Sequence, residues 1–496
     1  MRRLVIVNPP SEFLLDDRVF MSLGPVQIAT VARDFAEWRS HVIDLTGHSR
    51  RCRLVATAGP AGLEATRGAL VGAVSSQPTL AVAHDETCEI EIWANAEAEV
   101  AANPADVYGF YAMSCHAAVV TRLHQLVKRC WPRAVTVAGG PHASLAPGDF
   151  LRVGFDCVVA AQTGGGGGEV GLLELLRDVT IYGHPRQRVY TSRRGKMSHW
   201  NWPDRGLVDW ESYEYRLNGE RSASIVTQGG CPFVCTFCSH GEGYTDVGRR
   251  DHDHVRAELR EIRSRFGQRA VMIYDDEVNI DGRRVGGHFD RLCGVLHSEG
   301  FLWRAFAKSN IFDARQARLA AASGAVQLCT GAESADPAVK KAILKKSTVE
   351  DDSRFVRLCL ENGIAPKVFT MVGLQGETRE SAGRLKAWLL EMVGLGLRDF
   401  DVTVYTPYPG TRPFADPSQF GFRLRRPLEY TRETIIYKGK PGEYRSLVDI
   451  YDPATGKTLL TAEEIVALRD EVERDVRAAV ARVGGGSGGL RAVDGG

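Results

Sequence analysis

The chain has 496 residues, 44% of them hydrophobic and 25% charged, so it is long enough for two or three globular domains with ordinary cores. A formal net charge of +1 without a long basic run argues against nucleic acid or an anionic membrane surface as a partner. The eleven cysteines show no paired pattern, and no 18-residue apolar span or signal-peptide pattern occurs. We therefore expect a cytoplasmic protein without a membrane span.

The first 182 residues alternate between short apolar runs and helical patterns, which predicts a doubly wound parallel α/β domain. Strands are expected at 4–7, 41–45, 106–111, 134–138 and 156–159. Helices are expected at 26–38, 61–74 and 118–130. In such a domain ligands bind outside the carboxyl ends of the strands. Those ends carry Asn8-Pro9, Ser114-Cys115-His116 and Gly139-Gly140-Pro141-His142.

Residues 183–215 are polar, contain Pro185 and Pro203, and are interpreted as a linker. A strand at 223–227 then delivers the stretch Thr227 to His240, which contains Cys231, Cys235 and Cys238. Three thiolates on one loop suit an iron–sulfur cluster with one iron left open. The alternative is a structural zinc site with His240 as the fourth ligand, although none of the other eight cysteines lies in a CxxC pair.

Further strands are expected at 270–274, 303–307, 325–330, 365–372 and 400–405, and helices at 254–266, 314–323 and 348–360. Counted from the strand before the cysteines, these are six βα repeats, so residues 216–415 are predicted to form a partial TIM-like barrel. Polar or glycine-rich turns follow the strands at Asp275-Asp276-Glu277, Lys308-Ser309-Asn310, Gly331-Ala332-Glu333-Ser334, Gly373-Leu374-Gln375-Gly376-Glu377-Thr378 and Thr406-Pro407-Tyr408-Pro409-Gly410-Thr411.

The C-terminal region, residues 416–483, is predicted to be a small helical part. Thr461 and Glu464 form a capping-box pattern ahead of an apolar stripe at helical spacing. The stripe favours a helix packed on the barrel over one that binds a partner. The glycine-rich tail, residues 484–496, is predicted to be disordered.

The spacing C-x3-C-x2-C, with Phe237 just before the third cysteine, resembles the signature of the radical SAM superfamily. The G-x-E-S turn, the GLQGET turn and the PYPGT turn also resemble that family, although Gln375 replaces a proline and the usual Gly-Gly-Glu is missing at 275–277. The resemblance implies a [4Fe–4S] cluster on the three cysteines that cleaves S-adenosylmethionine (SAM). It implies SAM contacts from Phe237, Asp276 or Glu277, Ser309, Glu333 and Gly373. For the acidic turn at 275–277, a solvated helix cap is the alternative.

The region before the barrel resembles the cobalamin-binding domain of B12-dependent radical SAM proteins, through its opening NPP, Leu23-Gly24-Pro25, and Ala138 to Ser144 ahead of Phe155 to Val159. This implies a cobalamin site that includes Ser114, Gly139, Gly140 and His142. Two features depart from the family. No D-x-H-x-x-G occurs, and Gln162-Thr163 with five glycines stands where the family has GEGE. A Rossmann-like domain that has lost its cofactor is the alternative.

The resemblance implies cobalamin-dependent methyl transfer to an unactivated carbon or to phosphorus of a small molecule, such as a natural-product intermediate. A radical rearrangement, ring contraction or cyclisation, with cobalamin not methylating or absent, is the second hypothesis. A metal-binding module without turnover is the third. An external electron donor such as flavodoxin or ferredoxin is the expected partner. No residue is assigned as a catalytic acid or base.

Overall fold

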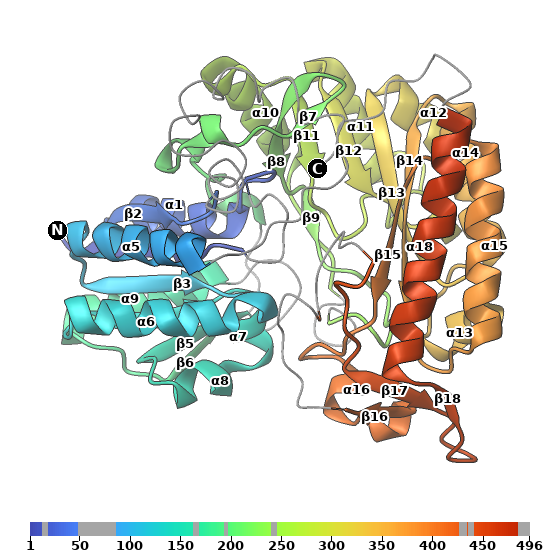
Figure 1. The fold of residues 1–496 in the computed structure, drawn as a ribbon. Coiled ribbons are helices and arrows are strands. Elements are labelled where there is room, and N and C mark those ends of the chain that lie inside the picture. The colour runs from blue at the N-terminus through green and yellow to red at the C-terminus, as the bar shows by residue number, and fades with distance from the viewer. Residues whose placement is uncertain are drawn as a thin grey trace. The chain divides into compact units, whose positions relative to one another are not determined.

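The computed structural model describes residues 1–11, 18–47, 86–161, 168–192, 197–239, 246–425, 434 and 441–484. The predicted helix at 61–74, the residues Gln162 and Thr163, the ligand candidate His240 and the tail after Gly484 lie outside these ranges. The chain divides into two compact units, Met1–Tyr215 and Arg216–Asp494, whose elements are labelled in Figure 1. Each unit is described by itself.

Unit 1 contains a six-stranded sheet in the order β2-β1-β3-β4-β5-β6, with all neighbours parallel. The strands are β1 (Arg3–Asn8), β2 (Arg39–Asp44), β3 (Val107–Tyr111), β4 (Val135–Gly139), β5 (Cys157–Ala161) and β6 (Val189–Ser192). Alternate residues of β1 enter different cores, Val5 and Val7 on one face and Leu4 and Ile6 on the other. Burial on both faces explains why the strands are almost continuously apolar in sequence.

The helices of unit 1 cover these two faces. They are α1 (Leu23–Ala36), α5 (Glu86–Ala102), α6 (Ala117–Cys130), α7 (Pro141–Leu145), α8 (Pro147–Arg152) and α9 (Gly168–Tyr182), with short 3-10 turns at η1 (Ser114–His116), η2 (Met197–His199), η3 (Arg205–Leu207) and η4 (Trp210–Ser212). The strand order reverses between β1 and β3, and such a switch point is where doubly wound sheets bind ligands. The doubly wound prediction is confirmed.

The interpretation of residues 183–215 as a linker needs a correction. Strand β6 lies inside this range and pairs in parallel with β5 at the edge of the sheet. Its Tyr190 is fully buried, and the Tyr190 hydroxyl donates a hydrogen bond to Asp178 of α9 at 2.7 Å. The first part of the expected linker therefore belongs to the packed domain.

Unit 2 is built on a seven-stranded sheet in the order β15-β14-β13-β12-β11-β8-β7. Six strands are mutually parallel, and only the short β7 runs antiparallel to its neighbour. The strands are β7 (Arg216–Leu217), β8 (Glu220–Ile225), β11 (Ala270–Ile273), β12 (Leu302–Phe306), β13 (Ala325–Glu333), β14 (Ala365–Val372) and β15 (Asp399–Val404). This confirms the partial (β/α)6 barrel.

Helices follow the barrel strands and pack on the outside of the sheet. They are α10 (His252–Phe266), α11 (His288–Glu299), α12 (Ala314–Ala322), α13 (Pro337–Ala342), α14 (Val349–Glu361) and α15 (Arg379–Leu395), with a 3-10 turn η5 (Ser309–Ile311). Thr348 and Thr378 each open a helix with a reciprocal capping box, which satisfies two backbone N–H groups apiece. Helices α11, α13 and α15 were not predicted individually from the sequence.

The C-terminal region, which was predicted to be helical, also contains a small sheet. After α16 (Arg412–Ala415) and η6 (Ser418–Phe420), a small antiparallel sheet forms from β16 (Phe422–Leu424), β17 (Val448–Tyr451) and β18 (Thr458–Leu460). The predicted capping box is confirmed: Thr461 and Glu464 exchange hydrogen bonds at 2.9 and 3.2 Å. It opens the long helix α18 (Ala462–Gly484).

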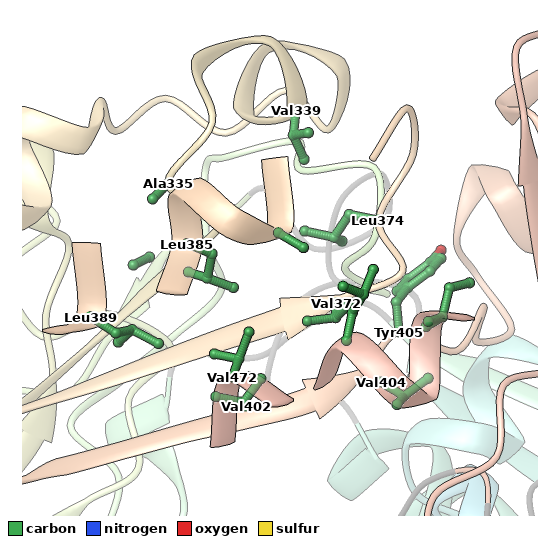
Figure 2. Packing of buried hydrophobic residues seen from close by; sticks show 14 of the residues in the cluster. Ala335, Val339, Val372, Leu374, Leu385, Leu389, Val402, Val404, Tyr405 and Val472 are labelled. Carbon is green, nitrogen blue, oxygen red and sulfur yellow. The ribbon is translucent and has the colours of Figure 1, made fainter. Parts of the chain in front are cut away.

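Helix α18 packs on the barrel as predicted. It lies alongside α15 and β15, and Lys386 of α15 pairs with its Glu471 at 2.5 Å (Figure 1). Figure 2 shows its Val472 within the same buried cluster as Val372, Val402 and Tyr405. Each fully buried valine stabilises the fold by about 1.5–3 kcal/mol relative to an exposed one. The helix is therefore part of the core of unit 2.

Candidate functional site

The cysteine loop leaves the carboxyl edge of the barrel sheet between two short strands. Strand β9 (Gln228–Gly229) precedes it, β10 (Gly248–Arg249) follows it, and the two pair antiparallel. Inside the loop, the Thr236 N–H donates to the Ile343 carbonyl at 3.0 Å and the Cys238 N–H to the Cys235 carbonyl at 3.1 Å. Cys235 is buried, while Cys231 and Cys238 are partly exposed. The loop is thus closed at its base and anchored to the segment after α13.

Two carboxylates after β11 hold the start of this loop. Asp275 is fully buried and accepts the backbone N–H groups of Thr227 and Gln228 at 2.6 and 3.0 Å, as well as the Thr227 hydroxyl. Asp276 accepts the Gly230 N–H at 2.7 Å. Burial raises the pKa of Asp275 to about 7, although its three donors act in the opposite direction. The predicted SAM candidate Asp276 is therefore engaged in positioning the loop.

Two lysines and two glutamates surround the loop. Glu277, Lys308 and Glu333 lie at strand ends, and Lys345 lies in the segment after α13. Lys345 is buried and pairs with Glu333 at 2.9 Å. Burial lowers the pKa of Lys345, but the charges of Glu333, Cys235 and Glu277 outweigh burial and raise it. Burial raises the pKa of Glu277 against the attraction of Lys308 and Lys345. Among the described residues, no hydrogen-bond donor reaches the Glu277 carboxylate, so it remains available to a ligand.

The lysines also contact the phenylalanines of the loop. The Lys308 ammonium lies 4.6 Å from the centroid of the Phe233 ring, and that of Lys345 lies 5.8 Å from the centroid of Phe237. Cation–π contacts of this kind stabilise by about 0.5–2 kcal/mol, depending on how far they are desolvated. The predicted SAM residue Phe237 therefore packs beside the Glu333–Lys345 pair.

The G-x-E-S turn depends on a glycine with a measurable steric role. Glu333 has a left-handed φ of 63°, and the register of β13 against β14 shifts between Gly331 and Glu333. A Cβ atom at Gly331 would lie 2.1 Å from the Glu333 Oε1 atom. The glycine thus leaves room for the Glu333 carboxylate to fold back toward Lys345.

Ser309 and Gly373 occupy the ends of β12 and β14. The Ser309 hydroxyl donates to Asp352 at 2.5 Å, and Asp352 pairs with Lys340. Gly373 has a φ of 102°, and a Cβ there would lie 3.0 Å from Ile465 of α18. The Gly373 N–H donates to Glu377, whose pKa burial raises to about 7. Both residues are placed at the same sheet edge as the cysteine loop, with bonds of their own to the protein.

This arrangement suits an iron–sulfur cluster. Each cysteine of a cubane binds a different iron, so the thiols need not meet at a single point. Indeed, in the part of the chain that the structure describes, no three His, Cys, Asp or Glu side chains are arranged around one ion. Three thiolates give such a cluster net negative charge, and Lys308 and Lys345 supply compensating cations next to Cys231 and Cys235.

In unit 1 the four cobalamin candidates gather at the carboxyl ends of β3 and β4. The Ser114 hydroxyl lies 3.1 Å from His142 Nδ1, and Asp149 lies 3.1 Å from His142 Nε2. His142 is buried, and burial lowers its pKa, only partly opposed by Asp149. Gly140 has a φ of 100°, and a Cβ there would lie 2.9 Å from the Ala112 carbonyl. A Cβ added at the neighbouring Gly139 would fit, because the nearest atom, the Val159 carbonyl oxygen, would lie 3.9 Å away.

Sequence reasoning missed several residues at the sheet edge of unit 2. Asp275, Lys308 and Lys345 were not selected, although the first two directly follow barrel strands. Their position at strand ends was the available signal for Asp275 and Lys308. Lys345 lies in a loop after α13 and carried no such signal.

Comparisons with known proteins agree with the resemblances proposed for the barrel of unit 2 and for the first domain in unit 1. Residues 225–389 match the Radical SAM superfamily, and residues 83–165 match the B12 binding domain. The fold resembles the radical SAM methyltransferase TsrM from Kitasatospora setae with a TM-score of 0.60 and 16% identity, over 97% of this chain and 89% of that one. It also resembles the cobalamin-dependent radical enzyme OxsB with a TM-score of 0.57 and 12% identity, over 78% of this chain and 52% of that one.

Two curated relatives share 25% identity with the chain. One is the anaerobic magnesium-protoporphyrin IX monomethyl ester cyclase of Rubrivivax gelatinosus, matched over 61% of this chain and 57% of the relative. The other is an uncharacterized methyltransferase of Pyrococcus horikoshii, matched over 62% of this chain and 68% of the relative. The chain spans about half the length of the cyclases that it matches.

The fold and the cysteine loop define a radical SAM protein. More specifically, the chain belongs to the radical SAM proteins that carry a B12-binding domain, and these domains imply a [4Fe–4S] cluster, SAM and cobalamin as cofactors. In the described ranges, no helix has the length and apolar character needed to cross a membrane.

Proposed function

We propose that this protein is a cobalamin-dependent radical SAM methyltransferase that acts on an unactivated carbon, or on phosphorus, of a small molecule. The observation that carries the proposal is a loop of three cysteines flanked by charged strand ends, in a chain that also has a B12-binding domain. When bound, the cluster supplies the electron that cleaves SAM to a 5'-deoxyadenosyl radical, and cobalamin supplies the methyl group.

The chain's own residues divide into binding and positioning roles. Cys231, Cys235 and Cys238 hold the cluster, while Asp275 and Asp276 fix the backbone through which the loop leaves the sheet. Glu277 accepts hydrogen bonds from the ammonium group of SAM, because its carboxylate is partly buried and receives no hydrogen bond from the described residues.

The remaining SAM assignments rest on position. Glu333 and Phe237 lie beside Lys345, and Ser309 and Gly373 lie at neighbouring strand ends. In unit 1, Ser114, Gly139, Gly140 and His142 contribute to the cobalamin site. A small-molecule substrate and an external donor such as flavodoxin or ferredoxin complete the reaction, and we expect a cytoplasmic location.

The domain limits proposed from the sequence are kept, apart from the linker. The first domain extends at least to Ser192 because β6 belongs to its sheet. The barrel begins at residue 216, where the two compact units divide.

The first test is anaerobic reconstitution with iron, sulfide and hydroxocobalamin, followed by counts of iron, sulfide and cobalt per chain. About four irons together with retained cobalt are expected. The loaded protein is then given SAM with a labelled methyl group, a reductant and candidate small molecules. Transfer of label to a product, with both 5'-deoxyadenosine and S-adenosylhomocysteine, would support methyl transfer.

A second function is favoured by the cyclase relatives: a radical cyclisation or other rearrangement. It predicts 5'-deoxyadenosine without S-adenosylhomocysteine and without transfer of label. Iron without SAM cleavage under strong reductant would contradict both reactions and leave a binding module.

A further inference from the structure

His116 is a buried polar side chain with unmet hydrogen-bonding capacity. It is the last residue of η1 and the N-cap of α6, directly after the carboxyl end of β3. Its side chain is 3% exposed, and neither Nδ1 nor Nε2 has a hydrogen-bond partner among the residues that the structure describes. The Tyr111 ring meets it edge-on, with centroids 6.3 Å apart.

The imidazole is neutral in this setting, because burial lowers the pKa of His116 to about 4. A neutral imidazole offers one N–H donor and one lone-pair acceptor. Buried groups of this kind almost always have partners, because leaving one unsatisfied is costly. A hydrogen-bond partner that is not among the described residues would therefore explain why a histidine occupies this position.

Several other polar groups at the same strand ends are already paired. Ser114 and Asp149 both bond His142, and the Ser144 hydroxyl bonds the Gly140 carbonyl and the Ala161 N–H. The backbone N–H of His142 donates to the Ala112 carbonyl at 3.0 Å, which ties the β4 turn to the segment that leads to His116. His116 thus stands at the switch point of the sheet, near the glycine turn, with both ring nitrogens buried and bonded by none of the described residues.

We propose that His116 hydrogen-bonds the bound cobalamin, with one ring nitrogen donating and the other accepting. Cobalamin suits such a residue because its peripheral amides carry both carbonyl acceptors and N–H donors, and its nucleotide tail adds phosphate and hydroxyl oxygens. The role extends the proposed function, on whose cobalamin it depends, and it requires no axial bond to cobalt.

The test measures the Kd for hydroxocobalamin by equilibrium dialysis on the full chain in the dark, without SAM. We expect His116→Phe to weaken binding about tenfold or more, since buried hydrogen bonds are lost. His116→Gln, which keeps a donor and an acceptor, should recover much of the affinity. The matched control is His124→Phe, because His124 is equally buried on α6 but stacks on Phe155 two turns away from the sheet edge.

Stability of the cofactor-free protein separates this role from a structural one. If cobalamin is the partner, His116→Phe should leave the Tm of the cofactor-free chain unchanged or raise it, because an unpaired polar group is removed. A lowered Tm with unchanged cobalamin affinity would overturn the proposal and assign the partner to the protein itself. Unchanged affinity with unchanged Tm would overturn it as well.

Cobinamide, which lacks the nucleotide tail, identifies the part of the cofactor that His116 contacts. An equal loss of affinity for cobinamide and cobalamin assigns the contact to the corrin amides, and a loss for cobalamin alone assigns it to the tail. If the unsubstituted chain binds no cobalamin, both this proposal and cobalamin-dependent methyl transfer fail. If the unsubstituted chain binds cobalamin and His116→Phe binds it with the same Kd, only the proposed role of His116 fails.

Discussion

The two sheet edges of the molecule are built by different means. In unit 2, carboxylates after the strands bind backbone N–H groups and lysines, so charged contacts fix the cysteine loop before any cofactor is present. In unit 1, the edge consists of glycines, serines and histidines whose pKa burial lowers, and one of these histidines, His116, has no hydrogen-bond partner among the described residues. The comparison indicates that unit 2 is preorganised to hold a loop, whereas unit 1 is arranged to receive a polar ligand.

The largest effect is expected when the three cysteines are replaced together. The triple substitution Cys231→Ala, Cys235→Ala and Cys238→Ala should reduce iron from about four per chain to nearly none and abolish SAM cleavage. Cobalamin retention should persist, because unit 1 has cores of its own. Metal analysis and cobalt content measure both effects. Cys130→Ala on α6 is the control, and iron that persists in the triple variant would place the cluster elsewhere.

The next effect concerns the carboxylate that we assign to SAM. Glu277→Gln should weaken SAM binding by about ten- to a hundredfold, since a charge-assisted hydrogen bond to the ammonium is lost. The iron content should stay the same, which separates loss of SAM from loss of the cluster. The control is Glu380→Gln, an exposed residue of α15. Unchanged SAM affinity in the Glu277 variant would transfer the role to Asp276 or Glu333.

Adjacent glycines of unit 1 offer a matched pair. Gly140→Ala should lower the free energy of unfolding by about 1–3 kcal/mol, because it combines a left-handed φ with a close backbone contact. Gly139→Ala should fold normally but weaken cobalamin binding, if that backbone approaches the ligand. Hydrogen exchange of unit 1 peptides and equilibrium dialysis provide the two measurements. Normal cobalamin affinity in a folded Gly139 variant would remove this glycine from the site.

The smallest effect is a pH dependence of unit 1. The pKa of His116 is about 4 in the folded chain and 6.5 for an ordinary histidine. Its neutral form is therefore favoured by folding, and the stability that this contributes is lost as the pH falls below 6.5. At pH 5.5 the loss is about 1 kcal/mol. Hydrogen exchange at pH 7 and 5.5 should show this loss in unit 1 of the cofactor-free protein, and His116→Phe should reduce it. An equal loss in that variant would assign the effect to other groups.

Much of the fold could be predicted because buried parallel strands carry their own signature. Strand β14 was predicted with its observed limits, and β1 within a residue at each end. Strand β1 is a continuous apolar run from Leu4 to Val7, and β14 is mostly apolar, interrupted by Lys367 and Thr370. Strand β6 was missed because a short edge strand in a polar stretch lacks that pattern. The three-stranded C-terminal sheet was missed for the same reason, since its strands have only three or four residues.

The candidate site shows a similar division. The cysteines were proposed as ligands from their spacing, and Glu333 as a SAM contact from its turn. The partners of those residues could not be found in this way, because pairing depends on distant segments. Lys345 meets Glu333 across a helix, and Asp275 meets Thr227 across 48 positions. Position at a strand end suggests that a carboxylate has a role, but it does not show whether the role is to bind a ligand or to hold the backbone.

Helix α18 has a consequence for how the protein is made. Its Ile465 lies against Gly373, and Val472 and Val476 fill the core beneath β14 and β15. The ribosome synthesises this helix long after the cysteine loop. The core of unit 2 therefore cannot close until α18 has been made and docks, so its apolar side chains on β14 and β15 stay exposed during most of translation.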